Sequence, residues 1–403
     1  MQFSDVIGQN EVKNQLMQMV TENRLSHALL FLGKEGSGAF ALARAFAQYI
    51  NCEKANPSFS KGPGVVSLFG EDEPSMSPVL MKDSCGTCSS CVKSAAMVHP
   101  DIHYSYPVYR KVSSKPALSS DFAVEWRKFT LENPYSNEYE WLQYINAENK
   151  QGNISREETS EIIHYLSLKS FESEYKILIV WMAEALGTTG NHLLKLVEEP
   201  PANTVFIFVA ENENLILPTI LSRTQLVKIP ALQKHEISEA LQVRQGLAEK
   251  EADQIASLST GNYFEALQLL QHASGSYDLQ LREWLNSILR TGPSAQVKWI
   301  DEMAKTGREK QKQFLKFFNQ LLHHAIRIET LGEETAFPSG SDSTNELATK
   351  LNKFNLAQKE AIINELDQAV YHIERNGNAK LIFHALTIRI YHIVSNNSLI
   401  LMA

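Results

Sequence analysis

The fold is decided by the glycine-rich stretch Gly33-Lys34-Glu35-Gly36-Ser37-Gly38-Ala39-Phe40. An apolar run, residues 28–32, precedes this stretch, and an alanine-rich segment, residues 41–47, follows it. Strand, glycine-rich turn and helix in this order form the context of a phosphate-binding loop, whose pattern is G-x-x-x-x-G-K-[ST]. The spacing therefore predicts a nucleotide-binding α/β fold. A chance glycine turn is the alternative, and the periodicity of the flanking segments weighs against it.

The two positions after the last glycine depart from this pattern. Ala39 stands where a lysine would neutralise phosphate, and Phe40 stands where a hydroxyl would bind magnesium. Gly33, Gly36 and Gly38 still allow backbone N–H groups to face an anion. Without the ammonium and the hydroxyl, little remains to hold Mg-ATP or to stabilise phosphoryl transfer. We therefore expect no functional ATP site, and a nucleotide-binding fold that serves as a scaffold.

Length and composition set the broad class. A chain of 403 residues predicts two to four domains, and 43% hydrophobic with 21% charged residues is typical of a globular protein. The net charge of −8 argues against one large basic surface, so a nucleic-acid partner needs a local patch or other subunits. The sequence has no run of 18 apolar residues and no signal-peptide pattern at its start. We expect a cytoplasmic protein without a membrane partner.

The four cysteines predict a metal site. Cys85, Cys88 and Cys91 form two overlapping C-x2-C steps, and Cys52 completes a set of four. Zinc binds four sulfurs tetrahedrally at about 2.3 Å, and small residues between the ligands let the backbone wrap the ion. A redox pair and free thiols are the alternatives, and the clustering favours structural Zn²⁺. An exposed loop rich in Pro, Gly and Ser is expected at residues 56–79.

A histidine and an aromatic-rich insertion follow the cysteines. His99-Pro100-Asp101 indicates a turn rather than a catalytic site. Residues 108–152 form a polar insertion rich in tyrosine and charged residues. We expect its aromatic side chains to pack onto their own domain, with packing on a neighbour as the alternative. These side chains are Phe122, Trp126, Phe129, Trp141 and Tyr144.

The next segment lacks a second catalytic element. Ser155 and Glu158 form a capping-box pattern that predicts the start of a helix. Residues 175–180 predict a buried strand of a parallel sheet. In a working P-loop ATPase this strand ends in an acid that manages magnesium and water. Here the strand ends at Trp181, and the nearest carboxylate, Glu184, lies too far along the chain to serve.

Several pieces together resemble one family. They are Ile7-Gly8-Gln9, His27-Ala28, the glycine loop, the three clustered cysteines, His99-Pro100-Asp101, residues 191–201 and residues 217–223. In this order, over most of residues 1–275, they resemble the bacterial clamp-loader AAA+ proteins. The resemblance implies an α/β, P-loop type parallel-sheet domain at 1–228, with a zinc knuckle at 52–91 and the insertion at 108–152. It also implies a small helical lid at 229–275 and an all-α collar domain for oligomerisation at 278–403.

The resemblance also assigns roles to individual residues. Ser222 and Arg223 match the family's Ser-Arg-Cys motif, with Thr224 in place of the cysteine. In the family this arginine reaches the γ-phosphate of ATP on a neighbouring subunit, as an arginine finger in trans. From the residues alone, a surface arginine in an ion pair is the favoured interpretation of Arg223. Phe264 occupies the position where active members carry an arginine that senses nucleotide.

The resemblance implies a non-hydrolysing stator subunit of the DNA polymerase III clamp loader, not an enzyme by itself. Its partners would be the clamp-loader ATPase (gamma/tau) and delta subunits in a hetero-oligomer, the sliding clamp, and primed DNA through the complex. One rival is an active clamp-loader-like AAA+ ATPase, which Ala39, Phe40 and Trp181 oppose. The other is a zinc-containing nucleic-acid-binding protein outside replication, which the acidic balance and the complete order of AAA+ pieces oppose.

Overall fold

The computed structural model describes residues 1–55, 83–111, 116–147, 150–271, 276–331, 342–374 and 377–396. The loop predicted at residues 56–79 lies outside these ranges. The chain divides into two compact units, each described here by itself. The first comprises Met1–Gly246 with Thr260–Glu265, and the second comprises Leu247–Ser259 with Ala266–Ala403. The three-domain division implied by the family resemblance stays a prediction.

The first unit is built on a parallel sheet of five strands. These are β1 (Ala28–Gly33), β2 (Ile102–Ser105), β3 (Lys176–Trp181), β4 (Thr204–Ala210) and β5 (Gln225–Ile229), in the spatial order β2-β3-β4-β1-β5. β3 and β4 are buried along their whole length, as a parallel sheet covered on both faces requires. This confirms the predicted α/β class. Since all strands run in one direction, the ends of β1, β3 and β4 meet at one edge, where the glycine loop begins.

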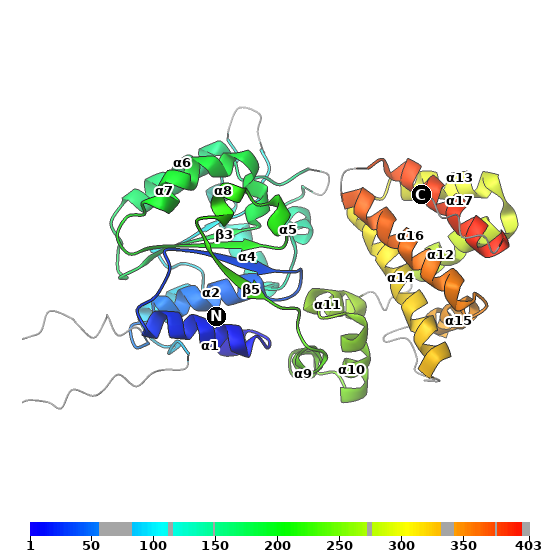
Figure 1. Cartoon of the computed structure of the whole chain (residues 1–403), viewed down its shortest axis with the longest axis horizontal. Coiled ribbons are helices and arrows are strands. Elements are labelled where there is room, and N and C mark those ends of the chain that lie inside the picture. Colours follow the sequence, from blue (N-terminus) through cyan, green and yellow to red (C-terminus); the bar gives the residue numbers. More distant parts are fainter. Residues whose placement is uncertain are drawn as a thin grey trace, which may run out of the picture. The chain divides into compact units, whose positions relative to one another are not determined.

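Helices cover both faces of the sheet (Figure 1). One face carries α6 (Arg156–Ser167), a 3-10 stretch (Ala183–Leu193), α7 (Leu194–Glu198) and α8 (Pro218–Leu221). The other face carries α1 (Asn10–Thr21), α2 (Ala39–Ile50) and α4 (Ala123–Glu132). Alternate side chains of each strand point to opposite faces. Leu30, Leu178 and Phe208 therefore join the core under α6 and α7, whereas Phe31 packs on Phe46 of α2 with ring centroids 6.1 Å apart.

Three further helices belong to this unit: α3 (Ser89–Ala95), α5 (Glu138–Tyr144) and α9 (Lys234–Gln245). The capping box predicted for α6 is only half formed. Ser155 Oγ accepts the backbone N–H of Glu158 at 3.1 Å, but the Glu158 carboxylate accepts the backbone N–H of Ser119 at 2.8 Å. The prediction of the reciprocal bond is wrong because the insertion brings a competing, buried donor to the same carboxylate.

The second unit is helical. Its helices are α10 (Glu249–Leu258), α12 (Ser276–Asn286), α13 (Pro293–Met303), α14 (Arg308–Leu331), α15 (Asp342–Leu351), α16 (Leu356–Glu374) and α17 (Ala379–Asn396), and α11 (Tyr263–Gln271) begins in the first unit. Trp284 and Trp299 stack in its core with ring centroids 5.0 Å apart. Phe314 and Phe383 pack against both rings. Within the described ranges, no helix is long and apolar enough to cross a membrane.

Candidate functional site

The glycine loop joins β1 to α2, as predicted. β1 ends at Gly33 and α2 begins at Ala39. Gly36 and Gly38 have backbone φ angles of +70° and +87°, a left-handed conformation that side chains with a Cβ adopt at a cost. Ser37 N–H donates to the carbonyl of Lys34 at 3.0 Å and closes the turn. The backbone therefore keeps the shape of a strand–loop–helix phosphate site.

Side chains of the same chain pack directly on this loop. A Cβ placed on Gly36 would lie 1.8 Å from Asn262 Oδ1, and one placed on Gly38 would lie 2.8 Å from the ring of Tyr135. Tyr263 N–H also donates to the Gly36 carbonyl at 3.2 Å. The glycines thus admit neighbouring groups of this chain at close range. The prediction from sequence did not find Tyr135 or Asn262, because both reach the loop from distant segments.

Aromatic rings occupy the positions that would manage magnesium. Phe40 lies with its ring centroid 5.5 Å from Trp126 and 5.8 Å from Trp181, and these two tryptophans are 5.0 Å apart. Tyr106 stacks on Trp126 at 4.0 Å, and Trp141 meets it edge-on at 5.0 Å. All five rings are buried. We call Phe40, Tyr106, Trp126, Trp141 and Trp181 the ring cluster.

The ring cluster includes two side chains of the insertion. Phe122, Trp126, Phe129 and Trp141 are buried, and Tyr144 packs against Phe129 with centroids 5.5 Å apart. This confirms that the aromatic side chains of the insertion pack on their own domain. Trp126 comes from α4 of the insertion and reaches both the start of α2 and the end of β3. The insertion therefore fills the space between these two elements.

Glu184 and Phe264 do not supply the missing groups. The Glu184 carboxylate accepts the backbone N–H groups of Glu211 at 2.5 Å and Asn212 at 2.8 Å. Burial raises the pKa of this carboxyl group above its usual value. Both bonds end on Oε1 and tie Glu184 to the turn after β4, while Oε2 is buried without a hydrogen-bond partner among the described residues. Phe264 is buried, and its backbone nitrogen lies 2.9 Å from the Cβ that would be built on Gly36.

The four cysteines come together as predicted. Their sulfur atoms all lie within 4.8 Å of one another, and the sulfurs of Cys85 and Cys91 are 3.9 Å apart. Tetrahedral zinc with bonds of about 2.3 Å separates its sulfur ligands by about 3.8 Å. The backbone N–H groups of Cys85, Cys88 and Cys91 donate to the sulfurs of Cys52, Cys85 and Cys88, at 3.2, 3.3 and 3.4 Å. This donor set fits a metal ion such as zinc.

Protonation of the cluster also suits a metal. The Cys91 thiol and nearby backbone N–H groups hydrogen-bond to Cys52 and lower its pKa to about 4, while the same contact raises the pKa of Cys91. A metal would bind the thiolate forms and replace the thiol protons of the cluster. A redox pair needs two cysteines, whereas all four gather here. Four sulfur ligands fill the tetrahedral shell and leave no position for catalysis.

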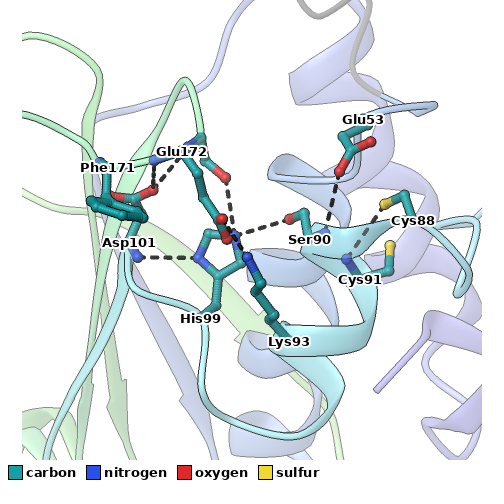
Figure 2. A network of polar contacts seen from close by, with 10 residues as sticks. Glu53, Cys88, Ser90, Cys91, Lys93, His99, Asp101, Phe171 and Glu172 are labelled. Carbon is teal, nitrogen blue, oxygen red and sulfur yellow. Dashed lines mark hydrogen bonds and ion pairs between the residues drawn. The ribbon is translucent and has the colours of Figure 1, made fainter.

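His99 ties the cysteine segment to the sheet (Figure 2). Its Nδ1 accepts the backbone N–H of Asp101 at 3.1 Å, and its Nε2 lies 3.1 Å from Ser90 Oγ and 3.0 Å from Ser173 Oγ. Ser90 belongs to α3, and Ser173 precedes β3. Burial lowers the pKa of His99 below its ordinary value, although the Glu172 carboxylate, whose Oε1 lies 3.4 Å from Nε2, acts in the opposite direction. We call Ser90, His99, Asp101 and Ser173 the His99 latch.

The Asp101 carboxylate is used entirely on backbone. It accepts the N–H groups of Phe171 at 2.5 Å, and of Glu172 and Ser173 at 2.8 Å each. Figure 2 shows this carboxylate turned to the 171–173 segment, away from the imidazole. A catalytic triad needs the carboxylate to orient the histidine ring, which it does not do here. The geometry favours the structural interpretation of His99-Pro100-Asp101.

Arg223 lies at the surface just after α8, with 36% of its side chain exposed. Its Nε pairs with the carboxylate of Glu198, the last residue of α7. Its Nη1 donates to the carbonyl of Thr219 at 3.0 Å and to Ser222 Oγ at 3.1 Å. The ion pair expected from the residues alone is therefore present. No sequence pattern indicated Glu198, which is 25 positions away from Arg223.

Sheet order, glycine loop and cysteine cluster define a P-loop α/β protein of the AAA+ class. Residues 8–64 and 72–233, more than half of the chain, match the model of the family described as "DNA polymerase III, delta subunit". The chain belongs to this family, a family of clamp-loader proteins.

Curated relatives agree with the family. The chain is 25% identical over 346 residues to DNA polymerase III subunit tau of Bacillus subtilis, covering 83% of this chain and 48% of tau. It is 25% identical over 265 residues to subunit delta' of the same organism, covering 64% of this chain and 60% of delta'. It is 28% identical over 223 residues to subunit gamma/tau of Mycobacterium bovis, covering 55% and 27%. The chain thus spans between about a quarter and three fifths of these relatives.

Solved structures are less similar. A gamma subunit-related DNA polymerase III protein of Thermotoga maritima is 13% identical, covers 94% of this chain and 98% of its own, and gives a TM-score of 0.35. A RuvB mutant of the same organism is 12% identical, covers 80% and 77%, and gives a TM-score of 0.34. These scores are too low to support an argument, so family membership rests on the sequence matches.

Proposed function

We propose that this chain is a delta-prime-type, non-hydrolysing subunit of a bacterial DNA polymerase III clamp loader. It supports the ATP-dependent loading of a sliding clamp onto primed DNA. It works in the cytoplasm as part of a hetero-oligomer with gamma/tau-type ATPase and delta-type subunits, and it reaches primed DNA through that complex. Family membership supports the assignment to a clamp loader. The filling of the glycine loop by this chain's own side chains is the main support for a subunit that does not hydrolyse ATP.

The filled loop argues against hydrolysis by this chain. Transfer of the γ-phosphoryl group needs cations and positioned donors around the phosphates. Ala39 and Phe40 provide neither an ammonium nor a hydroxyl, and Trp181 replaces the acid at the end of β3. The ring cluster is apolar at the point where a hydrated magnesium ion would sit. These features argue against the alternative hypothesis of an active AAA+ ATPase. Family membership argues against the other alternative, a zinc-containing nucleic-acid-binding protein outside replication.

Arg223 is the residue through which this chain acts on ATP bound elsewhere. A guanidinium has a fixed charge and forked donors that suit a transferring phosphoryl group. Arg223 is exposed on the first unit, and Ser222 holds one edge of it. We assign Arg223 as an arginine finger in trans, with Ser222 beside it. Cys52, Cys85, Cys88 and Cys91 hold a structural Zn²⁺ that stabilises the fold and takes no part in the reaction.

Nucleotide binding by the isolated chain tests whether its own side chains fill the glycine loop. Equilibrium binding of radiolabelled ATP and release of phosphate should both stay at background, with and without primed DNA and clamp. A chain that binds ATP stoichiometrically, or turnover that co-purifies with it and disappears on Lys34→Ala, a change at an exposed position of the loop, would contradict the proposal. Assembly is tested by gel filtration of the chain with purified gamma/tau-type and delta-type subunits, where a stable complex is expected.

Arg223→Ala tests the finger. In the reconstituted loader it should lower DNA- and clamp-stimulated ATP turnover by about twofold to tenfold. This is far less than the 10³ to 10⁵ of a finger serving a single site, because the other ATP sites of the loader keep their own arginines. Arg24→Ala is the matched control, since Arg24 is an exposed arginine in a local ion pair. Equal turnover and clamp loading by an intact Arg223→Ala complex would leave Arg223 as an ordinary surface residue.

A further inference from the structure

We propose that Glu198 is a positioning residue for Arg223. It holds the guanidinium in one orientation before a neighbouring subunit presents its nucleotide. This inference rests on the proposed role of Arg223 as an arginine finger. The structural observation behind it is the set of contacts that fix the Arg223 side chain.

Two of the three guanidinium nitrogens are engaged. Nε donates to Glu198, and Nη1 donates to the carbonyl of Thr219 and to Ser222 Oγ. Among the described residues, Nη2 has no hydrogen-bond partner. An arginine has five N–H donors, two of them on Nη2. The contacts therefore use three donors and leave a complete N–H pair for an incoming phosphate oxygen.

The groups that hold Arg223 are themselves anchored. Glu198 ends α7, whose Val197 is fully buried, and Thr219 lies in α8, whose Ile220 is buried as well. Val197 and Ile220 belong to the same hydrophobic core under the sheet. The Thr219 carbonyl and the backbone of Glu198 therefore have fixed positions, and the Glu198 carboxylate reaches the guanidinium from the end of α7. The long Arg223 side chain is thus contacted by groups from two helices whose backbones are anchored in the core.

The ion pair contributes little to the stability of the fold. With 36% of the Arg223 side chain and 46% of the Glu198 side chain exposed, water screens the attraction. Its larger effect is on the conformational freedom of Arg223, because a side chain ordered beforehand loses less entropy when it meets the phosphate. The Glu198 carboxylate also offsets part of the positive charge of Arg223. This weakens the attraction of Arg223 for phosphate and so opposes the gain from ordering. Removing the charge while keeping the acceptor separates these two effects.

The experiment uses the reconstituted loader, with steady-state ATP turnover measured against ATP concentration in the presence of clamp and primed DNA. Glu198→Ala should lower kcat by at most about twofold and by a smaller factor than Arg223→Ala, with little change in KM, since ordering acts on the reaction step. Glu198→Gln keeps an acceptor for Nε and should recover most of the loss. Glu199→Ala is the matched control, because Glu199 is the next residue, is also exposed, and has no ion pair among the described residues.

A double substitution supplies a readout that a general structural role would not move. Glu198→Ala combined with Arg223→Ala should behave like Arg223→Ala alone, because Glu198 acts only through that side chain. If Glu198→Ala leaves turnover unchanged or raises it while Arg223→Ala lowers it, the positioning role is overturned and the finger stands. If Arg223→Ala has no effect in an intact complex, the finger itself is overturned, and the inference falls with it.

Discussion

Gly36 and Gly246 share a backbone φ of +70° but differ in their surroundings. A Cβ at Gly36 would strike Asn262 Oδ1 and the backbone nitrogen of Phe264, whereas a Cβ at Gly246 would meet nothing within 4 Å. Both alanine substitutions pay the left-handed strain of about 1–2 kcal/mol. Only the substitution at Gly36 must also displace the backbone at Phe264. Comparing the two variants therefore separates the effect of packing on the loop from the effect of its backbone conformation.

We therefore predict that Gly36→Ala lowers the free energy of unfolding by about 3 kcal/mol or more, and Gly246→Ala by about 1 kcal/mol. Urea unfolding followed by circular dichroism measures both. Equal losses for the two variants would show that Asn262 and Phe264 do not pack on the loop in solution.

At this scale the sequence identified residues whose type and spacing carry the chemistry. Ala39, Phe40 and the four cysteines are read directly from their motifs, and the structure brings the cysteines together. Glu198, Tyr135 and Asn262 were not predicted. Each makes its contact across 25 or more positions, and no local pattern encodes which side chain a folded chain brings to a given point. Long-range packing decides these contacts.

The His99 latch joins three elements that the sequence separates. It connects α3 with the segments before β2 and β3, through a ring that accepts one backbone N–H and contacts two hydroxyls. Strands β1 and β3 were predicted from their apolar runs, because a buried parallel strand has a simple pattern. The capping box of α6 was predicted only in part, because Ser119 competes for Glu158. From the sequence, His99-Pro100-Asp101 was predicted only to form a turn, and its contacts with Ser90 and Ser173 were not predicted.

Stability should depend on pH through this latch. Burial lowers the pKa of His99 below its ordinary value of 6.5. Below about pH 6.5, His99 binds a proton in the unfolded chain but not in the folded chain. His99 therefore stabilises the fold above this pH, and this stabilisation is lost as the pH falls through the pKa of the folded state. His99→Asn should reduce the free energy of unfolding at pH 7.5 by about 1–3 kcal/mol, through lost buried hydrogen bonds, and flatten its decline toward pH 5.5.

Urea unfolding at pH 7.5, 6.5 and 5.5 measures this difference. His235→Asn is the control, because His235 is exposed on α9. Profiles of wild type and His99→Asn that run parallel would show that His99 is not buried in its neutral form.

The whole molecule consists of two compact units, and the cysteine cluster belongs to the first. A domain with its own core unfolds as its own cooperative unit. Metal bound by the cluster stabilises the folded state in which the four sulfurs meet. Loss of the metal is therefore expected to affect one unit and not the other.

We predict one zinc per chain in the wild type, and less in Cys88→Ser. The thermal transition of the sheet unit should fall by about 5 °C or more, since a domain of 150–250 residues loses about 2–4 °C per kcal/mol. The transition of the helical unit should not move. Metal analysis and calorimetry measure this, with Ser89→Ala, an exposed neighbour, as the control. Full zinc retention in Cys88→Ser would remove the metal assignment.

The ring cluster makes it costly to introduce the two residues that the glycine loop lacks. A lysine at position 39 would start from a buried backbone position, and burying its ammonium without a partner would cost several kcal/mol. A threonine at position 40 would remove a buried ring that packs against two tryptophans, at a cost of about 3 kcal/mol. Each single reversion weakens the fold before it regains any chemistry. A chain whose own aromatic rings pack around its glycine loop in this way cannot regain the two missing residues of a nucleotide site without first losing stability.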